Sequence, residues 1–326
     1  MPANLPPEYF QAEKLYRQAK TPEEKVEALE AMLSIMPKHK GTDKLRAVLR
    51  TKIAKFSEES QRRLATGRRG SGHYVKKEGA GQVILVGLPN AGKSQLVAAV
   101  TEAAPIVADY PFSTQTPTPG MMSFENIQIQ LVDIPPIIDR NAQPWLPNLL
   151  RGADLLLLMV DLSQEPLSQM ETIKEELGKL KIRPVGRTEG TELWVYPKKA
   201  LIVGNKSDLD DSGERFRKLE PEYGAEFPIV SISAKNGTGL EELKREIYRS
   251  LEIIRVYTKA PGKQADLEEP VILKKGSTVE NAAQSIHKDF RAKLKYAQVW
   301  GSGKFDGQKV KREHILEDGD IIELHI

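Results

Sequence analysis

One short stretch of the chain combines glycines, a lysine and a serine at the spacing G-x-x-x-x-G-K-S, from Gly87 to Ser94. Glycines let a backbone wrap around a phosphate chain so that its N–H groups point at the negative charge. Lys93 adds a cation for the outer phosphate oxygens, and the Ser94 hydroxyl suits Mg²⁺. An apolar run at 82–86 predicts a strand before the loop, and 95–100 predicts a helix after it. We therefore prefer a phosphate-binding loop to an ordinary strand-to-helix turn.

Two further segments are predicted to complete a metal site. The stretch 110–120 is rich in hydroxyls and prolines and cannot be a regular helix. Thr114 within it can close over Mg²⁺ and the last phosphate, although such stretches are often only loops. Asp133 ends a predicted strand at 127–132, where a carboxylate can hold a metal-bound water; a strand-ending residue without that role is the alternative. The predicted metal ligands are Ser94, Thr114 and Asp133, and the predicted catalytic residues are Lys93, Thr114 and Asp133.

A third group of residues is suited to recognising guanine. The sequence N-K-S-D at 205–208 follows a predicted buried strand at 200–203. The Asp208 carboxylate can accept hydrogen bonds from N1–H and the exocyclic amine of guanine, which adenine does not offer in that arrangement. Lys206 is expected to lie along the base and Asn205 to tie neighbouring loops together, while Ser233-Ala234-Lys235 ends a predicted strand at 228–232. The predicted nucleotide-binding residues are Asn90, Ala91, Gly92, Lys93, Ser94, Gln95, Asn205, Lys206, Asp208, Ser233, Ala234 and Lys235.

The elements that carry these residues alternate between strands and helices. A buried strand is predicted at 155–160, a helix at 164–180, part of a short hairpin at 191–196 and a helix through Leu240, Leu243 and Ile247. Strands that alternate with helices form a mostly parallel sheet with helices on both faces. We therefore expect an α/β domain over 82–255.

Smaller units are predicted at the two ends. Helices are expected at 8–20, at 22–36 and from about residue 42 to about residue 64, forming an N-terminal arm over 1–66, and a basic flexible linker follows at 67–81. The outer face of the third helix is basic, which suits either contact with RNA or a solvated surface. Residues 269–326 predict a strand at 271–273, a helix starting at Ser277-Thr278 with Ala282, Ile286 and Phe290 inward, and a last strand at 321–326. This pattern predicts a ubiquitin-like β-grasp domain over 256–326.

Composition limits the class of protein. The chain has 326 residues, enough for two or three domains, and a net charge of +3, too small by itself to indicate a nucleic-acid-binding protein. It has no cysteine, which excludes disulfides and thiolate metal sites. No apolar run is long enough for a membrane span and the first 30 residues lack a secretory core, so a cytoplasmic protein is expected.

The order of the motifs resembles the translation-factor-like GTPases, and more closely the Obg superfamily and its developmentally regulated GTP-binding protein (DRG) family. The resemblance rests on the segments at 87–94, 110–114, 133–135, 205–208 and 233–235. The segments at 255–263, 285–288 and 296–301 look like the TGS domain of that family. The resemblance implies a Ras-like P-loop G domain that binds GTP, hydrolyses it slowly to GDP and phosphate with Mg²⁺, and works with the ribosome or RNA. A TGS domain with a purely regulatory or structural role is the alternative.

The chain departs from the family pattern at several places. Pro136 replaces the glycine of D-x-P-G whose N–H would reach the γ-phosphate, and Ile137 stands where many GTPases have a water-orienting glutamine. Asn90 matches the residue that binds a monovalent cation in potassium-stimulated relatives, so K⁺ is a candidate activator. The span from Asp161 to Lys199 is too short for the insert domain of the eukaryotic members. Two alternatives stay open: a GTP-binding scaffold that does not hydrolyse, and an RNA-binding protein whose G domain only supports folding.

Overall fold

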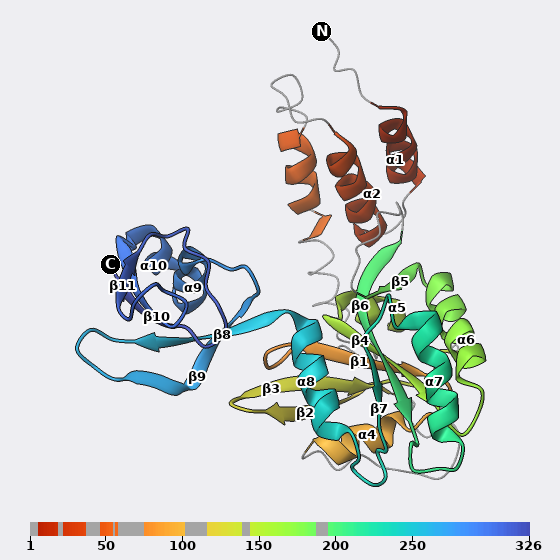
Figure 1. The fold of residues 1–326 in the computed structure, drawn as a ribbon. Coiled ribbons are helices and arrows are strands. Elements are labelled where there is room, and N and C mark those ends of the chain that lie inside the picture. The colour runs from red at the N-terminus through yellow and green to blue at the C-terminus, as the bar shows by residue number, and fades with distance from the viewer. Residues whose placement is uncertain are drawn as a thin grey trace. The chain divides into compact units, whose positions relative to one another are not determined.

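The computed structural model describes residues 6–18, 22–36, 46–54, 56–57, 75–101, 116–138, 144–186 and 195–326. The chain forms two compact units, Met1–Gly72 and His73–Ile326. Figure 1 shows the elements of both units, which are described here one at a time.

The first unit is helical. It contains α1 (Pro7–Gln18), α2 (Pro22–Ile35) and a third helical segment at 46–54 and 56–57. Proline suits the first position of both α1 and α2 because the N–H it lacks would have no partner within the helix. Ala12, Leu29 and Leu49, one from each segment, are buried in a shared core. The predicted start and end of the third helix and the residues 58–74 lie outside the described part of the chain.

The second unit contains a seven-stranded sheet in the order β2-β3-β1-β4-β6-β5, with β7 paired to β6. Its strands are β1 (Gln82–Gly87), β2 (Thr118–Phe124), β3 (Ile127–Asp133), β4 (Leu155–Asp161), β5 (Ile182–Val185), β6 (Tyr196–Asn205) and β7 (Ile229–Ser231). All pairs are parallel except β2 with β3. The prediction of a mostly parallel sheet is confirmed.

Helices cover both faces of this sheet (Figure 1). They are α4 (Lys93–Val100), α5 (Leu146–Gly152), α6 (Pro166–Lys179), α7 (Ser212–Tyr223) and α8 (Leu240–Leu251). Alternate residues of β1 enter two separate cores: Leu85 packs in the core that contains α4 and α8, and Ile84 in the core that contains α5, α6 and α7. Burial on both faces explains why the central strands read as continuous apolar runs. Within the described ranges, no helix is long and apolar enough to cross a membrane.

The structure corrects one expectation about a strand and adds another strand that was not predicted. The hairpin predicted at 191–196 is wrong where it is described, because Tyr196 begins β6 itself and β6 pairs in parallel with β5. Pro197 is tolerated there because β4 pairs with β6 only from Ala200 onward. β2, which was not predicted, begins at Thr118 inside the stretch that was expected not to form a regular helix, and Pro119 lies on this edge strand.

A five-stranded sheet forms the C-terminal part of the second unit, in the order β11-β10-β12-β8-β9. Its elements are β8 (Ile253–Lys259), β9 (Ala265–Lys274), α9 (Val279–Ile286), α10 (Lys288–Lys293), β10 (Tyr296–Trp300), β11 (Gln308–Val310) and β12 (Ile321–His325). Thr278 caps α9 in a capping box with Asn281, and Ala282 packs into the core of this sheet. The mixed α+β domain is confirmed, but Ile286 does not point inward, because its exposed fraction is 36%.

A polar network connects the turn between β2 and β3 to the C-terminal sheet. The Arg255 guanidinium, with only 13% of the side chain exposed, pairs with Asp318 at 2.8 Å and with Glu125 in the turn. The Tyr248 hydroxyl donates to Asp318 at 2.6 Å, and the Asn126 amide donates to the Tyr257 hydroxyl at 2.7 Å. Burial of Asp318 disfavours its charge, but the hydrogen bonds from Arg255 and Tyr248 outweigh burial and hold the pKa of Asp318 below its ordinary value.

We predict that Asp318→Asn lowers the free energy of unfolding at pH 7 by about 1–2 kcal/mol, because hydrogen bonds to a charged group are lost. A carboxyl whose pKa is depressed in the folded state stabilises above its unfolded pKa and loses that contribution as the pH falls through the folded pKa. Unfolding by urea at pH 7, 5, 4 and 3 should therefore show a shallower acid destabilisation in the variant than in the wild type. Asp306→Asn, the same change at an exposed position, should leave the profile unaltered. Equally steep profiles in wild type and Asp318→Asn would contradict the assignment.

Candidate functional site

The loop between β1 and α4 contacts the ammonium group at the end of the Lys93 side chain. Nζ of Lys93 donates to the carbonyl oxygens of Gly87 at 3.1 Å and Leu88 at 3.2 Å, and the residue is only 7% exposed. Burial lowers the pKa of Lys93 to about 8, while the nearby Asp133 carboxylate acts in the opposite direction. The ammonium is therefore mostly charged at neutral pH and is held at the centre of the loop.

The backbone of this loop depends on Gly92. Gly92 precedes α4 with φ +88°, and a Cβ at this position would lie 2.2 Å from Nδ2 of Asn205. The first N–H groups of α4 point out of the N-terminal end of the helix toward the loop, and no side chain of the described residues caps this end, as in phosphate-binding helix ends. Asn90 is exposed with φ 62°, and Gln95 lies in the first turn of α4, partly exposed. The predicted phosphate-binding residues are thus adjacent in one strand-loop-helix unit.

Ser94 and Asp133 come together from different elements. The register of β1 on β3 places Leu85 opposite Asp133, so the carboxylate lies at the edge of the sheet from which the loop leaves. Oγ of Ser94 donates to Oδ2 of Asp133 at 2.5 Å, and Asp133 is 2% exposed. A hydroxyl and a carboxylate are the hard oxygen donors that Mg²⁺ prefers, so the pair fits this ion. Thr114, the third predicted ligand, lies outside the described residues.

Asn205 joins the phosphate loop to the segment after β7. Its Nδ2 donates to the carbonyl oxygen of Ala91 at 2.9 Å, and its Oδ1 accepts from the backbone N–H of Ala234 at 3.0 Å. The side chain is 1% exposed, and its two bonds connect segments that lie far apart in the sequence. The expectation that Asn205 ties loops together agrees with this geometry.

Lys206 is positioned by a residue that the sequence analysis did not single out. Its Nζ contacts Oδ2 of Asp161 at 2.6 Å, and Asp161, at the end of β4, is 4% exposed. Asp161 also accepts from the hydroxyl of Ser163 at 2.6 Å. Because Asp161 ends β4 just as Asp133 ends β3, its place at the carboxyl end of a buried strand was the signal that could have identified it.

Asp208 is exposed but held in place by a buried partner. Oδ1 of Asp208 accepts from the hydroxyl of Ser233 at 2.6 Å, and Ser233 is 0% exposed. This hydrogen bond is the main cause that lowers the pKa of Asp208. Ala234 is buried beside Asn205, and Lys235 is exposed at the same turn. The arrangement presents an ionised carboxylate with one oxygen fixed, next to backbone N–H groups.

The residues after Asp133 turn away from the site. Ile137 is 1% exposed and packs in the core with α5 and α6, so its side chain cannot contact a phosphate or a water beside one. Pro136 is buried and has no N–H to donate. Neither residue supplies the groups that these positions have in many GTPases.

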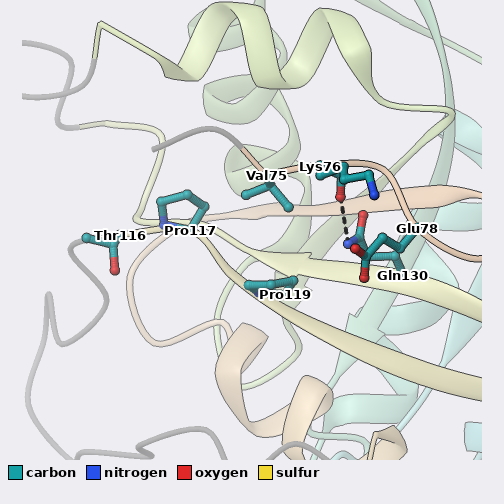
Figure 2. A pocket seen from close by; sticks show the side chains of 7 residues that line it. All are labelled: Val75, Lys76, Glu78, Thr116, Pro117, Pro119 and Gln130. Atoms are coloured by element: carbon teal, nitrogen blue, oxygen red, sulfur yellow. Dashed lines mark hydrogen bonds between the residues drawn. The ribbon is translucent and has the colours of Figure 1, made fainter. Parts of the chain in front are cut away.

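A separate pocket lies near the start of β2. It has a volume of about 300 Å³ and is lined by Val75, Lys76, Glu78, Thr116, Pro117, Pro119 and Gln130. Figure 2 shows these side chains around it, with the Gln130 amide donating to the Lys76 carbonyl oxygen at 3.0 Å. None of them is a predicted nucleotide-binding residue, and one lysine beside a glutamate gives little attraction for a phosphate chain. We do not assign the nucleotide to this pocket.

Comparison with known proteins gives matches for both domains. Residues 82–189 match the protein family described as 50S ribosome-binding GTPase, and residues 254–326 match the TGS domain. The chain is 32% identical to an uncharacterized GTP-binding protein of Methanocaldococcus jannaschii, with 93% of each chain covered. It is 28% identical to GTP-binding protein 1 of Schizosaccharomyces pombe and 26% identical to human developmentally-regulated GTP-binding protein 2, covering 92% of this chain and 98% of each relative.

The alignment with the human protein extends over 360 positions, more than the 326 residues of this chain, so that relative has residues without a counterpart here. The absence of an insert between Asp161 and Lys199 stays a prediction. The match nevertheless runs through the GTPase domain and the TGS domain in the same order. The chain therefore belongs to the family of developmentally regulated GTP-binding proteins.

Proposed function

We propose that this protein is a cytoplasmic, Mg²⁺-dependent GTPase that hydrolyses GTP slowly to GDP and phosphate and works on the ribosome or RNA. One observation carries the proposal: the buried Asn205 side chain bonds both to the phosphate loop at Ala91 and to Ala234 in the segment expected to contact guanine. This bridge holds a phosphate-binding half and a base-binding half together. A nucleotide that spans both halves is the ligand that suits it.

The phosphate half supplies charge and metal ligands. Lys93 would stabilise the negative charge that develops on the β- and γ-phosphates as a water attacks the γ-phosphorus in line. Ser94 and Thr114 would ligate Mg²⁺, and Asp133 would hold a water on it; the ion supplies charge stabilisation and orientation of the phosphates. The exposed Asn90 is the proposed contact for K⁺.

The base half supplies specificity for guanine. Asp208 would accept from N1–H and the exocyclic amine, and the fixed Ser233 contact aims its second oxygen at the base. The N–H of Ala234 is occupied by Asn205, so the amide of Lys235 is the candidate donor to the guanine oxygen. Lys206, held by Asp161, would lie along the base.

The rate is proposed to be slow because position 137 offers no group to orient water. A partner or an ion must then supply what the chain lacks, and K⁺ near Asn90 or the ribosome are the two candidates. The description of the matched GTPase family as ribosome-binding and the TGS match support the second. Pro136, which cannot donate to the γ-phosphate, favours a different function: a GTP-binding scaffold for the ribosome or RNA without turnover.

We predict that the purified protein releases phosphate from GTP above background, more so with K⁺ than with Na⁺ or when ribosomes are added. Lys93→Ala should lower the rate at least about a hundredfold, as expected when a group that stabilises transition-state charge is removed. Lys218→Ala, an exposed lysine on α7, is the matched control and should keep the wild-type rate. If the protein binds guanine nucleotide but shows no turnover in any of these conditions, the GTPase proposal is refuted and the GTP-binding scaffold is the function that remains.

We predict that the affinity for GDP falls about fourfold between pH 7 and pH 8.5. The free protein has a Lys93 pKa of about 8, and only the charged form attracts phosphate, so binding weakens as the fraction of charged ammonium drops. Titration calorimetry at both pH values measures the ratio. The Lys93→Ala variant corrects for titration of the guanine N1–H, and an equal ratio in both proteins would refute the role of Lys93.

We predict that Asp208→Asn weakens GDP binding at least about tenfold and improves binding of xanthosine diphosphate. Xanthine has a carbonyl in place of the exocyclic amine of guanine, so an amide donor suits it where a carboxylate does not. Competition between the two nucleotides for wild type and variant measures the change. Asp210→Asn, two residues away and also exposed, should preserve the guanine preference; loss of all binding without a gain for xanthine would contradict base contact by Asp208.

A further inference from the structure

One face of the C-terminal sheet carries aromatic and basic side chains that the proposed GTPase site does not use. Along β10, Ala297 and Val299 are buried in the core with α9, whereas Tyr296, Gln298 and Trp300 alternate to the opposite face and are partly exposed. Residues paired across a sheet share a face. The same face therefore also presents His325 opposite Tyr296 and both Lys309 and Glu323 opposite Gln298.

The rings and the lysines on this face are in contact. Nζ of Lys309 lies 3.7 Å from the ring centroid of Tyr296, and Nζ of Lys259 lies 4.2 Å from that of Trp300. The His325 ring stacks on Tyr296, with centroids 4.4 Å apart and planes at 12°. The face thus holds two aromatic platforms, each with a cation beside it.

The acidic group next to Gln298 on this face is already compensated. Glu323 is only 8% exposed, and its carboxylate is 3.5 Å from Nζ of Lys259. Lys309 lies on the edge strand β11 and is exposed, with no carboxylate recorded within ion-pair distance of its ammonium in the described chain. Lys309 therefore leaves a positive charge on the face where a ligand would meet it, whereas the charge of Lys259 is balanced by Glu323.

Flat rings and lysines at this spacing match the chemistry of a single-stranded nucleic acid. Bases stack on aromatic rings whatever their sequence, and the phosphates between them pair with lysine. Tyr296 and Trp300 are four residues apart on one strand, or about 13 Å at about 3.3 Å per residue, so each ring has room for its own base. An acidic peptide would satisfy the lysines but has no planar groups for two rings.

We propose that this face binds single-stranded RNA, with one base on Tyr296, one on Trp300 and the intervening phosphates on Lys259 and Lys309. When a base takes the ring, the flexible lysine moves from the ring to a neighbouring phosphate. The proposal rests on the proposed association with RNA or the ribosome and gives that association a site. Double-stranded RNA does not fit, because its bases are not free to stack on the rings.

The test uses the full chain and a fluorescein-labelled, unstructured 12-nucleotide RNA, with binding followed by anisotropy. Tyr296→Leu and Trp300→Leu should each weaken binding about tenfold or more, as expected for loss of one stacked base. Trp300→Phe should keep the affinity within about threefold, while the RNA-induced quenching of tryptophan emission that we expect in the wild type should disappear. Lys309→Gln should lower the slope of log affinity against log salt by about 1.

Lys293→Gln is the matched control, since it removes the same charge from α10, which packs with α9 on the other side of the sheet. Its affinity should equal that of the wild type. Equal weakening by Lys293→Gln and Lys309→Gln, or quenching that is absent from the wild type, would overturn the assigned face. Loss of ribosome binding by the leucine variants with unchanged affinity for the free RNA would assign the face to a protein partner and refute RNA.

Phosphate release and ribosome sedimentation are measured on the same proteins. Variants that lose RNA binding but keep phosphate release and ribosome sedimentation would show that the face acts apart from those two functions, which supports the RNA assignment. If the wild type hydrolyses GTP and sediments with ribosomes but does not bind the RNA, only the sheet-face proposal is refuted. Absence of turnover and of ribosome binding fails the proposed function, whatever the RNA result.

Discussion

The two hydrogen bonds of the Asn205 side chain hold the proposed nucleotide site of this protein together. An amide can donate to one backbone group through its nitrogen and accept from another through its oxygen at the same time, without carrying a charge. Both bonds are buried, so loss of either leaves a backbone group without a partner in a dry environment. The lack of a side chain at Gly92 is the matching constraint, because a Cβ there would occupy the position of the Asn205 amide nitrogen.

The sheet places Asn205 where these bonds are possible. β4 and β6 pair in parallel so that Asp161 lies opposite Asn205, and β1 pairs with both β3 and β4. Four strands therefore end at one edge with Gly87, Asp133, Asp161 and Asn205 as their last residues. Parallel strands bring their carboxyl ends together, and that is why residues distant in sequence become neighbours here. The helices that cover both faces keep the central strands dry and their register fixed.

Much of this could be predicted from the sequence because the residues concerned have few alternatives. A lysine that follows a glycine between an apolar strand and a helix is typical of a phosphate-binding loop. The sequence N-K-S-D after a buried strand is typical of guanine recognition. Asp161 was missed because it carries no motif; its importance comes from Lys206, which turns back toward it with φ 69°. The motif at 205–208 does not name the partner of Lys206, so the place of Asp161 at the end of β4 was the one sequence signal for this contact.

The strand errors have a different cause. Proline is disfavoured inside a sheet, but Pro197 and Pro119 each lie where one side of the strand has no partner, a fact that only the completed sheet provides. Ile286 fits a helical stripe, yet α9 ends at this residue and leaves its side chain partly in solvent. Predictions agreed with the structure where the chemistry of a residue decides its conformation, and they failed where neighbouring strands or the end of a helix decide it.

The anchored turn between β2 and β3 limits how this domain can signal. Its tip is fastened by Arg255 and Tyr257, and its base is fastened by the buried amide pair of Gln82 and Gln130 at 2.8 Å. Sliding the hairpin by one residue would break both attachments and turn Gln130 toward the opposite face of the sheet. The hairpin is therefore fixed in register and cannot slide by one residue. A shift in the position of Asp133 would reach the C-terminal sheet as strain along the hairpin, with no sliding of one strand past another.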